Sequence, residues 1–481
     1  MGKLYDQAVE FHSKSTDFVS LTYETPTSTY YICYYKTLVN MNNLNQYIFP
    51  ALHRLKGEGI QKSYEALPFS DRSILTDYEE MTKKLLIGYL MISTLEEDAC
   101  IALQVIQTDA RSIEAPEIEF SVIGPKEAFI ESLDTNIMLI RRRLPLTQLR
   151  VEEYTIGHVT QTRCVVMYIE DLANPINITS MVKRLNSINT DVITDSTSMT
   201  QLMEDNKYSL FPQFIETERP DRLVHILSAG GIAVIAEGSS QAFSGPATLG
   251  QFLVAYEDYY LPWHIGSFFR ILRIFAILFS ILVTPMYIAV LTYHYHLIPT
   301  LLLEPIISSR INLPFPPFME VIFMELSIEL LREAGARLPS KIGQTIGIVG
   351  GIVLGTAAVQ AALTSNILLI LVALSALSSF TVPIFHMSNT IRVLRYPFII
   401  AASMFGLVGI LICACFLLTH LLRLKSLGTP FLQPYYPLRP QDWVDSIIRA
   451  PLNNFTTRAT VNRPLFKSKK SKLEPLNDID E

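Results

Sequence analysis

Three long stretches without a charged side chain dominate the second half of this 481-residue chain. Residues 274–303, 342–391 and 396–422 contain no Asp, Glu, Lys or Arg. A charged side chain at the centre of a bilayer costs about 2.5 to 3.5 kcal/mol on insertion scales, so such stretches are typical of membrane segments. We therefore predict an integral membrane protein with a membrane-embedded C-terminal half and a large water-soluble N-terminal half.

The charge-free stretches predict four membrane spans, because a helix needs about 20 residues to cross a bilayer. The first stretch holds one span and the third holds one, whereas the second stretch is long enough for two. The predicted spans are residues 271–292, 342–363, 367–387 and 397–421.

A fifth segment, residues 314–331, is apolar but carries Glu320, Glu325 and Glu329. It is a span facing protein or water, a re-entrant segment or an interfacial helix. If the N-terminal half is cytoplasmic, a topology of four spans places the arginines between residues 332 and 395 outside the cell. A topology of five spans places these arginines inside but the lysine-rich C-terminal tail outside. Neither count satisfies the positive-inside rule. We expect an all-α polytopic domain of four to five segments, and the side of the C-terminal tail stays open.

The N-terminal half has the pattern of an α/β region, with short apolar strands alternating with amphipathic helices. Two stretches, residues 28–55 and 162–189, both read as strand, polar turn and helix. A duplicated α/β subdomain is one interpretation. Two ordinary βα units of similar length are the other. The predicted strands are 30–35, 100–106, 164–169 and 232–236, and the predicted helices are 44–55, 76–91, 126–143 and 176–188.

These patterns divide the chain into four regions. We expect a first α/β subdomain over residues 1–115, a second over 116–258, and a transmembrane domain over 259–427. A Pro-rich juxtamembrane stretch and a charged, disordered tail fill 428–481. The first 20 residues lack the apolar core of a secretory signal, so the internal apolar segments must direct insertion.

Composition excludes several classes of function. The net charge of −6 gives no basic field for nucleic acid. Five cysteines without metal-ligand or disulfide spacing fit a reduced, cytosolic soluble half and predict no metal. No phosphate-binding loop, zinc-protease motif or nucleophile elbow is present, so we expect neither an enzyme nor a cofactor.

A glycine ladder marks the second charge-free stretch. Gly343, Gly347, Gly351 and Gly355 recur every four residues and therefore share one helix face. Small residues at this spacing let another helix approach closely. The face packs against a helix of the same or a neighbouring subunit, or it forms a pore wall.

Charged residues near the membrane segments are the other candidates. Glu325 and Glu329 lie one helical turn apart and would attract cations in a vestibule or pore. The alternative is a structural Glu–Arg network or a plain interfacial helix. Two arginine pairs precede the first and last spans and are expected to anchor helix ends at the lipid interface. They are Arg270, Arg273, Arg392 and Arg395.

Long matching motifs make the chain resemble the GerA family, specifically the A subunits of bacterial spore germinant receptors. The resemblance covers about residues 120–435 and is looser over 15–115. The motifs that carry it are Gly124-Pro125-Lys126-Glu127-Ala128-Phe129, Thr217-Glu218-Arg219-Pro220-Asp221-Arg222, Glu257-Asp258-Tyr259-Tyr260, Met324-Glu325-Leu326 and Leu331-Arg332-Glu333-Ala334-Gly335.

The resemblance implies a role in starting germination of dormant spores in response to nutrients. Family members sit in the inner spore membrane with a permease-like B subunit, which looks like the nutrient binder, and a lipoprotein C subunit. The A subunit is thought to form an oligomeric, pentameric cation channel, with its N-terminal domain facing the core. On this reading Glu325 and Glu329 attract cations, and Gly343, Gly347 and Gly351 pack the pore helices.

Two functions remain open from the sequence. The first is a nutrient-gated cation channel subunit. The second is a non-conducting membrane scaffold that relays nutrient binding from the B subunit. A secondary transporter would predict inverted repeats of spans, and the sequence shows none.

Overall fold

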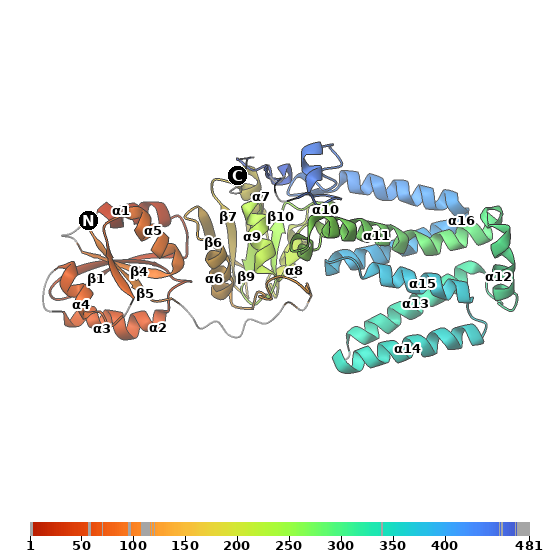
Figure 1. Ribbon diagram of the computed structural model, residues 1–481, viewed down its shortest axis with the longest axis horizontal. Coiled ribbons are helices and arrows are strands. Elements are labelled where there is room, and N and C mark those ends of the chain that lie inside the picture. The colour runs from red at the N-terminus through yellow and green to blue at the C-terminus, as the bar shows by residue number, and fades with distance from the viewer. Residues whose placement is uncertain are drawn as a thin grey trace, which may run out of the picture.

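The computed structural model describes residues 3–55, 59–69, 71–94, 98–106, 116, 118–119, 121–337, 340–451, 453, 456–466 and 468. Figure 1 shows an elongated molecule in which two α/β units follow one another and a helical bundle forms the far end. The expected division into an α/β N-terminal half and a helical C-terminal half is confirmed.

The first unit is a five-stranded antiparallel sheet with helices on both faces. Alternate residues of the second strand point to opposite faces, as the pleat requires. Tyr31 and Cys33 join the core under one face, and Ile32 and Tyr34 join the core under the other. The strands in spatial order are β1 (Phe18–Glu24), β2 (Thr29–Tyr35), β4 (Tyr89–Thr94), β5 (Cys100–Gln104) and β3 (Arg72–Leu75). The helices are α1 (Lys3–His12) and α5 (Tyr78–Ile87) on one face, and α2 (Met41–Asn43), η1 (Leu44–Ile48), α3 (Phe49–Arg54) and α4 (Ile60–Ala66) on the other.

The second unit repeats this architecture. Its strands in spatial order are β6 (Leu149–Ile156), β7 (Thr162–Ile169), β9 (Ile232–Ala236), β10 (Ala242–Gly245) and β8 (Ile215–Thr217). Its helices are α6 (Leu133–Arg143) and α9 (Pro220–Ser228) on one face, and α7 (Pro175–Asn186) and α8 (Ser196–Met203) on the other.

The two sheets have the same strand order and the same alternation of hairpins and helices along the chain. Asn40 and Asn174, which the duplication hypothesis aligns, have the same structural role. Each is a helix N-cap whose side-chain oxygen accepts backbone N–H groups of the first helical turn. Matching strand order and matching caps favour two similar subdomains over two unrelated βα units.

Two predicted helices have different limits in the structure. The predicted helix 76–91 ends at Ile87, because Gly88 adopts a left-handed conformation (φ 103°) that terminates it, and strand β4 starts at Tyr89. The predicted helix 126–143 begins only at Leu133, and the preceding residues are irregular. The α/β pattern located the buried strands better than the helix ends.

A buried ion pair joins the two units. Arg141 of α6 binds the carboxylate of Asp17, donates to the Ser15 hydroxyl at 2.9 Å, and lies 4.1 Å from the centre of the Tyr35 ring. The backbone N–H of Thr16 also donates to a carbonyl of β6 at 2.9 Å. One hydrophobic core continues across this contact.

The helical bundle follows the second unit through two short helices. These are α10 (Leu249–Leu253) and η2 (Tyr256–Tyr259). The bundle itself comprises α11 (Trp263–Thr292), η3 (Tyr295–Leu297), α12 (Thr300–Arg310), α13 (Pro317–Ala336), α14 (Ser340–Gln360), α15 (Asn366–Ser379) and α16 (Phe385–Arg423). Within the described residues, α11 and α16 are long and apolar enough to cross a membrane.

Helix α16 is a hairpin of two helices rather than one rod. Residues 390 and 420 would lie about 45 Å apart along a straight helix. Yet the Thr390 hydroxyl donates to the Leu210 carbonyl at 2.6 Å, and His420 lies 3.0 Å from the Ser209 hydroxyl. The chain reverses at Gly406, whose backbone is not helical (φ 61°, ψ −139°).

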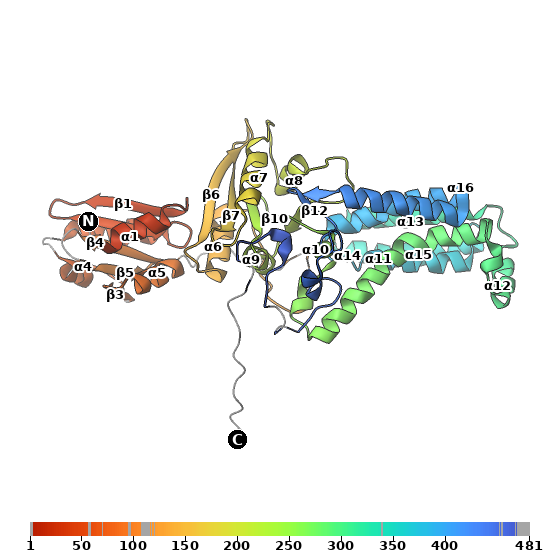
Figure 2. The same ribbon diagram turned by 90° about the horizontal axis from the view of Figure 1, so that it is seen from above.

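This hairpin corrects the predicted topology. The expected single span 397–421 is divided by Gly406, so the expected four to five segments are not confirmed. Among the described helices, six passes alternate in direction: α11, α13, α14, α15 and the two limbs of α16. Helix α12 lies across the far end of the bundle (Figures 1 and 2).

An even number of passes returns the chain to the soluble units. Residues after α16 form the strands β11 (Lys425–Ser426) and β12 (Thr429–Pro430) and the turns η4 (Pro440–Val444) and η6 (Thr460–Asn462). Ser426 donates to the Gln213 carbonyl at 2.6 Å, and the Asn177 amide donates to the Asn462 carbonyl at 3.2 Å. The C-terminal segment 424–466 therefore lies on the same side of the bundle as the N-terminal half. The predicted disordered tail falls largely outside the described residues.

We predict that Gly406→Ala lowers the stability of the full chain by about 1 to 3 kcal/mol, because only glycine adopts this conformation without strain. A Cβ atom at this position would also lie 2.8 Å from the His294 ring. Thermal unfolding in detergent measures the loss. Gly335→Ala is the control: it lies within α13, and no described atom lies within 4 Å of its Cβ position, so it should stabilise slightly. Equal effects of the two substitutions would contradict the hairpin turn.

Candidate functional site

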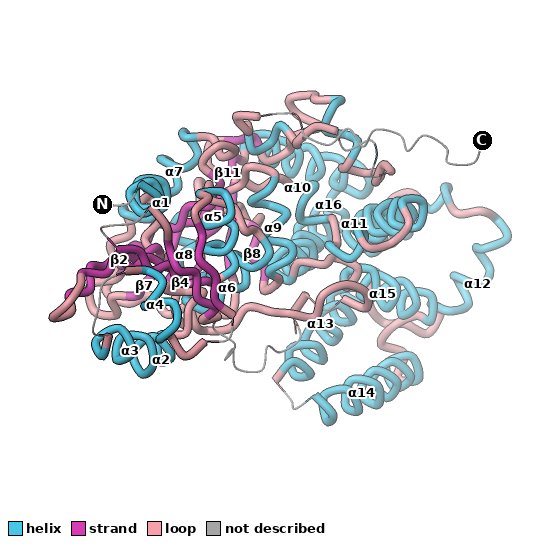
Figure 3. The backbone as a smooth tube through the Cα atoms, turned by 60° about the vertical axis from the view of Figure 1, so that its left-hand side comes forward, coloured by secondary structure: helices cyan, strands magenta, loops and turns pink. Residues whose placement is uncertain are grey.

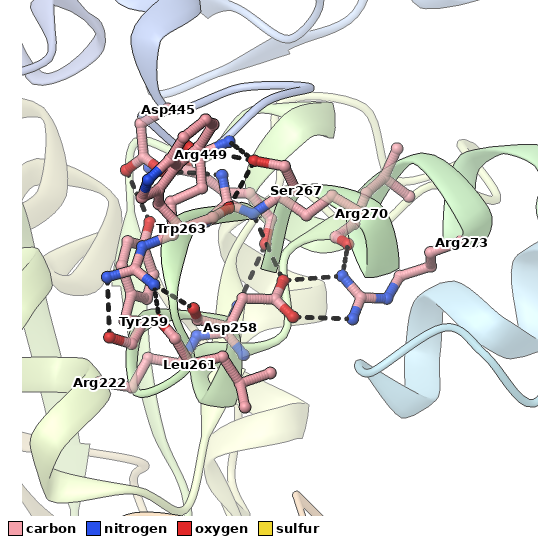
Figure 4. A network of polar contacts seen from close by, with 12 residues as sticks. Arg222, Asp258, Tyr259, Leu261, Trp263, Ser267, Arg270, Arg273, Asp445 and Arg449 are labelled. Atoms are coloured by element: carbon pink, nitrogen blue, oxygen red, sulfur yellow. Dashed lines mark hydrogen bonds and ion pairs between the residues drawn. The ribbon is translucent and has the colours of Figure 1, made fainter. Parts of the chain in front are cut away.

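A buried polar network joins the second α/β unit to the start of α11 (Figure 4). Asp258, at the end of η2, accepts from Arg270 at 3.3 Å and from Arg273 at 3.0 and 3.2 Å. The Asp258 side chain is only 1% exposed. A carboxylate and two guanidinium groups removed from water are stable only when they pair with one another, so this contact sets how α11 leaves the soluble unit.

The C-terminal segment completes the same network. Asp445 accepts from Arg270 at 2.8 Å and from the Tyr259 hydroxyl at 2.7 Å. The Arg449 guanidinium donates to the carbonyls of Asp258 and Tyr259 at 2.8 and 3.0 Å. Two segments almost two hundred residues apart in sequence are thus tied to one helix start.

The segment connecting the two sheets reaches the same place. Arg219 binds Asp221 at 2.8 Å and also the Ser121 hydroxyl. The Tyr260 hydroxyl, just before α11, donates to Asp221 at 2.7 Å. Gly124 lies against the Tyr260 ring so closely that a Cβ atom would come within 2.7 Å of it. The base of α11 therefore contacts the inter-sheet segment, the second unit and the C-terminal segment.

We predict that Asp258→Asn lowers the stability of the full chain by about 3 to 5 kcal/mol, because it leaves two buried guanidinium groups without their shared carboxylate. Asp445→Asn should cost less, because Asp445 is 28% exposed and Arg270 keeps its bond to Asp258. Thermal unfolding and the rate of trypsin cleavage after Arg449 measure both effects. An Asp445→Asn loss as large as that of Asp258→Asn would contradict this ranking.

A second set of ion pairs lies inside the bundle. Glu325 of α13 pairs with Arg395 of α16 at 2.5 Å, and Arg395 also donates to the Ser280 hydroxyl of α11 at 2.7 Å. Glu329 binds Arg392 and Arg332, each at 3.2 Å. Three helices are joined by these contacts.

The structure places each of the six charged candidates near the membrane segments in an ion pair. Glu325 is 4% exposed, whereas Glu329 is 43% exposed. A cation can bind either carboxylate only where an arginine releases it, so the pathway role of both glutamates stays a prediction. The lipid-anchor role of Arg270, Arg273, Arg392 and Arg395 also stays a prediction, because their guanidinium groups bind carboxylates inside the protein.

The glycine ladder lies on α14, which runs along the edge of the bundle beside α13 (Figures 1 and 3). A Cβ atom at Gly351 would lie 3.9 Å from Leu331 of α13, and one at Gly355 would lie 3.5 Å from Leu369 of α15. The side-chain surroundings of Gly343 and Gly347 fall outside the described residues. On the remaining surface of α14, Ile352 is exposed.

A cavity of about 280 Å³, with mixed polar and apolar walls, lies between α8, β8 and the first turns of α16. Glu216 of β8 accepts from the Thr200 hydroxyl at 2.7 Å and lies 3.0 Å from His386 of α16. Glu204 lines the same cavity and accepts a backbone N–H from Gln213 at 3.1 Å. Among the described residues, no group of three metal-binding side chains converges here or elsewhere.

Burial raises the pKa of the Glu204 carboxyl to about 7, from a usual value of 4.5, and the nearby Glu216 carboxylate adds to the rise. The folded protein therefore keeps this proton to a higher pH than the unfolded chain does. Stability contributed by the protonated carboxyl is lost as the pH rises from about 4.5 through 7.

We predict that Glu204→Gln, which mimics the protonated acid, raises the melting temperature strongly at pH 8 and only slightly at pH 5, because most of the stabilisation is lost above pH 5. Thermal unfolding in detergent across this pH range measures the difference. Glu10→Gln, an exposed carboxylate on α1, is the control and should change neither value. A parallel shift of the Glu204→Gln curve at both pH values would contradict the assignment.

Comparison with known proteins identifies the family. The model of the family described as "Bacillus/Clostridium GerA spore germination protein" matches residues 7–461. The chain belongs to the GerA family. Spore germination protein GerQA of Bacillus cereus is 44% identical over 480 residues, which cover 98% of this chain and 95% of that protein.

Other GerA relatives are similar over most of the chain. Spore germination protein GerIA of Bacillus cereus is 44% identical over 96% of this chain and 70% of its own length. Spore germination protein A1 of Bacillus subtilis is 36% identical over 88% of both chains. Among solved structures, the N-terminal domain of the A subunit of the Bacillus megaterium spore germinant receptor GerK3 matches 51% of this chain and 93% of that chain, at 21% identity and a TM-score of 0.38.

Sequence reasoning missed the carboxylates and the arginine that complete the network at α11. Asp258 belongs to the Glu257-Asp258-Tyr259-Tyr260 motif that carried the family resemblance, so its position was visible but its partners were not. Asp445 and Arg449 lie in a Pro-rich stretch without periodicity. No local pattern connects them to Arg270.

Proposed function

We propose that this GerA-family chain is the A subunit of a spore germinant receptor and forms an oligomeric, nutrient-gated cation channel that starts germination. Its nutrient-binding partner is a permease-like B subunit, with a lipoprotein C subunit as third member. The observation that carries the receptor role is the similarity to spore germination proteins over nearly the whole chain.

The arrangement of helices supports a membrane location. Helices α11 and α16 are long and apolar, and the passes between them alternate in direction. Exposed apolar side chains such as Phe275, Phe405 and Leu411 cover the outside of the bundle, which suits a lipid environment. The proposed site is the inner spore membrane, with both α/β units and the C-terminal segment on the core side.

Helix α14 is the proposed subunit-packing and pore-forming helix. It contacts its own bundle mainly through α13, and its exposed face combines small residues with apolar ones. A glycine-faced helix at the edge of a bundle is suited to close packing against a second copy of the chain. Gly343, Gly347 and Gly351 carry this role in a ring of subunits, which the family resemblance makes a pentamer, whereas Gly355 is buried against Leu369 and packs the helix within its own bundle.

Glu329 is the better candidate of the two glutamates for attracting cations. It is half-exposed, and its two arginine contacts at 3.2 Å are longer than the Glu325–Arg395 contact. In this proposal Glu325 acts through Arg395, because their ion pair holds α13 against α16. A motion that opens the channel must either break this ion pair or move the two helices together.

A non-conducting scaffold is the second candidate function. The ion pairs that join the soluble units, the C-terminal segment and the bundle favour it equally, because rigid coupling is what a relay between subunits needs. A scaffold needs no ion pathway, so flux distinguishes the two.

We predict that cells expressing this chain with its B and C partners release potassium only after the activating nutrient is added. Glu329→Gln should change the rate or ion selectivity of this efflux several-fold without changing complex assembly. Glu333→Gln is the matched control, because Glu333 is exposed one turn further along α13 and pairs with Arg337 alone. Glu325→Gln should instead lower assembly, since it leaves Arg395 buried and unpaired.

Intact complexes that show no efflux with a nutrient that triggers the spores would exclude the channel and leave the scaffold. Efflux that is identical in the Glu329→Gln, Glu333→Gln and parent complexes would keep the channel but remove Glu329 from its pathway.

A further inference from the structure

We propose that the loop 206–210 of the second α/β unit contacts the membrane directly, inserting its apolar side chains between anionic phospholipid headgroups on the core side. This inference rests on the membrane location proposed above. The α/β half would then contact the membrane through this loop as well as through its covalent link to α11.

Two contacts place the loop at the inner ends of both limbs of α16. Ser209 lies 3.0 Å from His420, one turn before the second limb ends at Arg423. The Leu210 carbonyl accepts from Thr390, which lies in the second turn of the first limb, at 2.6 Å. Because α16 is a hairpin, these ends mark the level at which its apolar limbs leave the membrane.

The side chains of the loop separate into an inward and an outward set. Phe211, next to the loop, is buried and packs against the rings of His420 and Phe431. Tyr208 is 98% exposed, and Leu210 is also exposed. A tyrosine has an apolar ring and a polar tip, so it is stable at the boundary between acyl chains and headgroups.

The exposed apolar surface continues from the loop onto α16. Leu210 and Val393 line the same cavity, and the outer part of Val393 is exposed. Val393 lies two turns into the first limb of α16, whose later residues Ile400 and Met404 are also exposed. The loop therefore extends the apolar surface of α16 toward the soluble unit.

Charge around the loop fits an anionic partner. Lys207 is exposed within the loop, and Arg423 and Lys425 are exposed where the second limb of α16 ends. Asp205, beside the loop, is already bound to Arg184 and to the backbone N–H of Gly428. Glu204 and Glu216, which line the cavity with Leu210, accept from the Gln213 N–H and the Thr200 hydroxyl. Basic side chains at this level are attracted to the negative surface of an anionic membrane.

Single-tryptophan variants of the full chain test this contact. Trp263 and Trp443 are the chain's two tryptophans and are replaced by Phe. Tyr208→Trp then reports on the loop, Leu411→Trp reports on the exposed surface of α16, and Val159→Trp is the matched soluble control. Val159 is exposed in the β6–β7 turn, at the opposite edge of the same sheet from β8, which faces α16.

The variants are reconstituted into phosphatidylglycerol–phosphatidylcholine vesicles that contain lipids brominated near the headgroup. Tyr208→Trp should be quenched at least two-fold more strongly than Val159→Trp, and omission of phosphatidylglycerol should reduce that quenching. The loop contact would be overturned if Tyr208→Trp were quenched no more than Val159→Trp. Strong quenching of Leu411→Trp by lipids brominated at mid-chain would, in that case, still support the membrane location.

Absence of quenching at Leu411→Trp as well would remove the membrane location, and the loop contact with it. Quenching of Tyr208→Trp that is unchanged without phosphatidylglycerol would overturn the anionic partner.

Discussion

The carboxylate of Asp258, buried between two guanidinium groups, is the interaction on which the arrangement of this molecule depends. Neither arginine of α11 can be removed from water without it, and the C-terminal segment reaches the helix through one of the same arginines. The charges thus hold together three parts of the chain, which also share one hydrophobic cluster through Phe252, Ile277 and Phe431. Arg141 and Asp17 do the same between the two α/β units.

The patterns of charged and apolar residues correctly predicted an α/β N-terminal half and a helical C-terminal half. They did so because the composition of a segment reflects whether it folds in water or in an apolar environment. An α/β half, a helical half and the glycine-faced helix follow from residues near one another in sequence. The hairpin of α16 does not, because Gly406 lies in an apolar run and only its backbone conformation reveals the reversal. The pairing of Glu325 with Arg395 spans 70 residues, so no local spacing indicates it.

In the α/β units, too, sequence analysis found features that depend on neighbouring residues and missed others. Alignment of Asn40 with Asn174 found a real structural correspondence, since both side chains cap a helix at the same place in the fold. Edge strands such as β1 and β6 escaped sequence analysis, because the predicted strands were continuous apolar runs, whereas polar residues interrupt β1 and β6. Sequence analysis offered a Glu–Arg network as the alternative to a cation vestibule, and the structure shows such ion pairs. The partners on α16, Arg392 and Arg395, could not be assigned from local spacing.

If the bundle lies in the membrane as proposed, an even number of passes also determines which residues are accessible from the opposite side. In the proposed orientation, with both α/β units and the C-terminal segment on the core side, the described residues beyond the membrane are the turns that join the passes. Two of these turns are short, at residues 361–365 and around Gly406, and the third contains all of η3 and α12. A lipid-anchored or soluble partner on that side would therefore meet this chain almost entirely through residues 293–316.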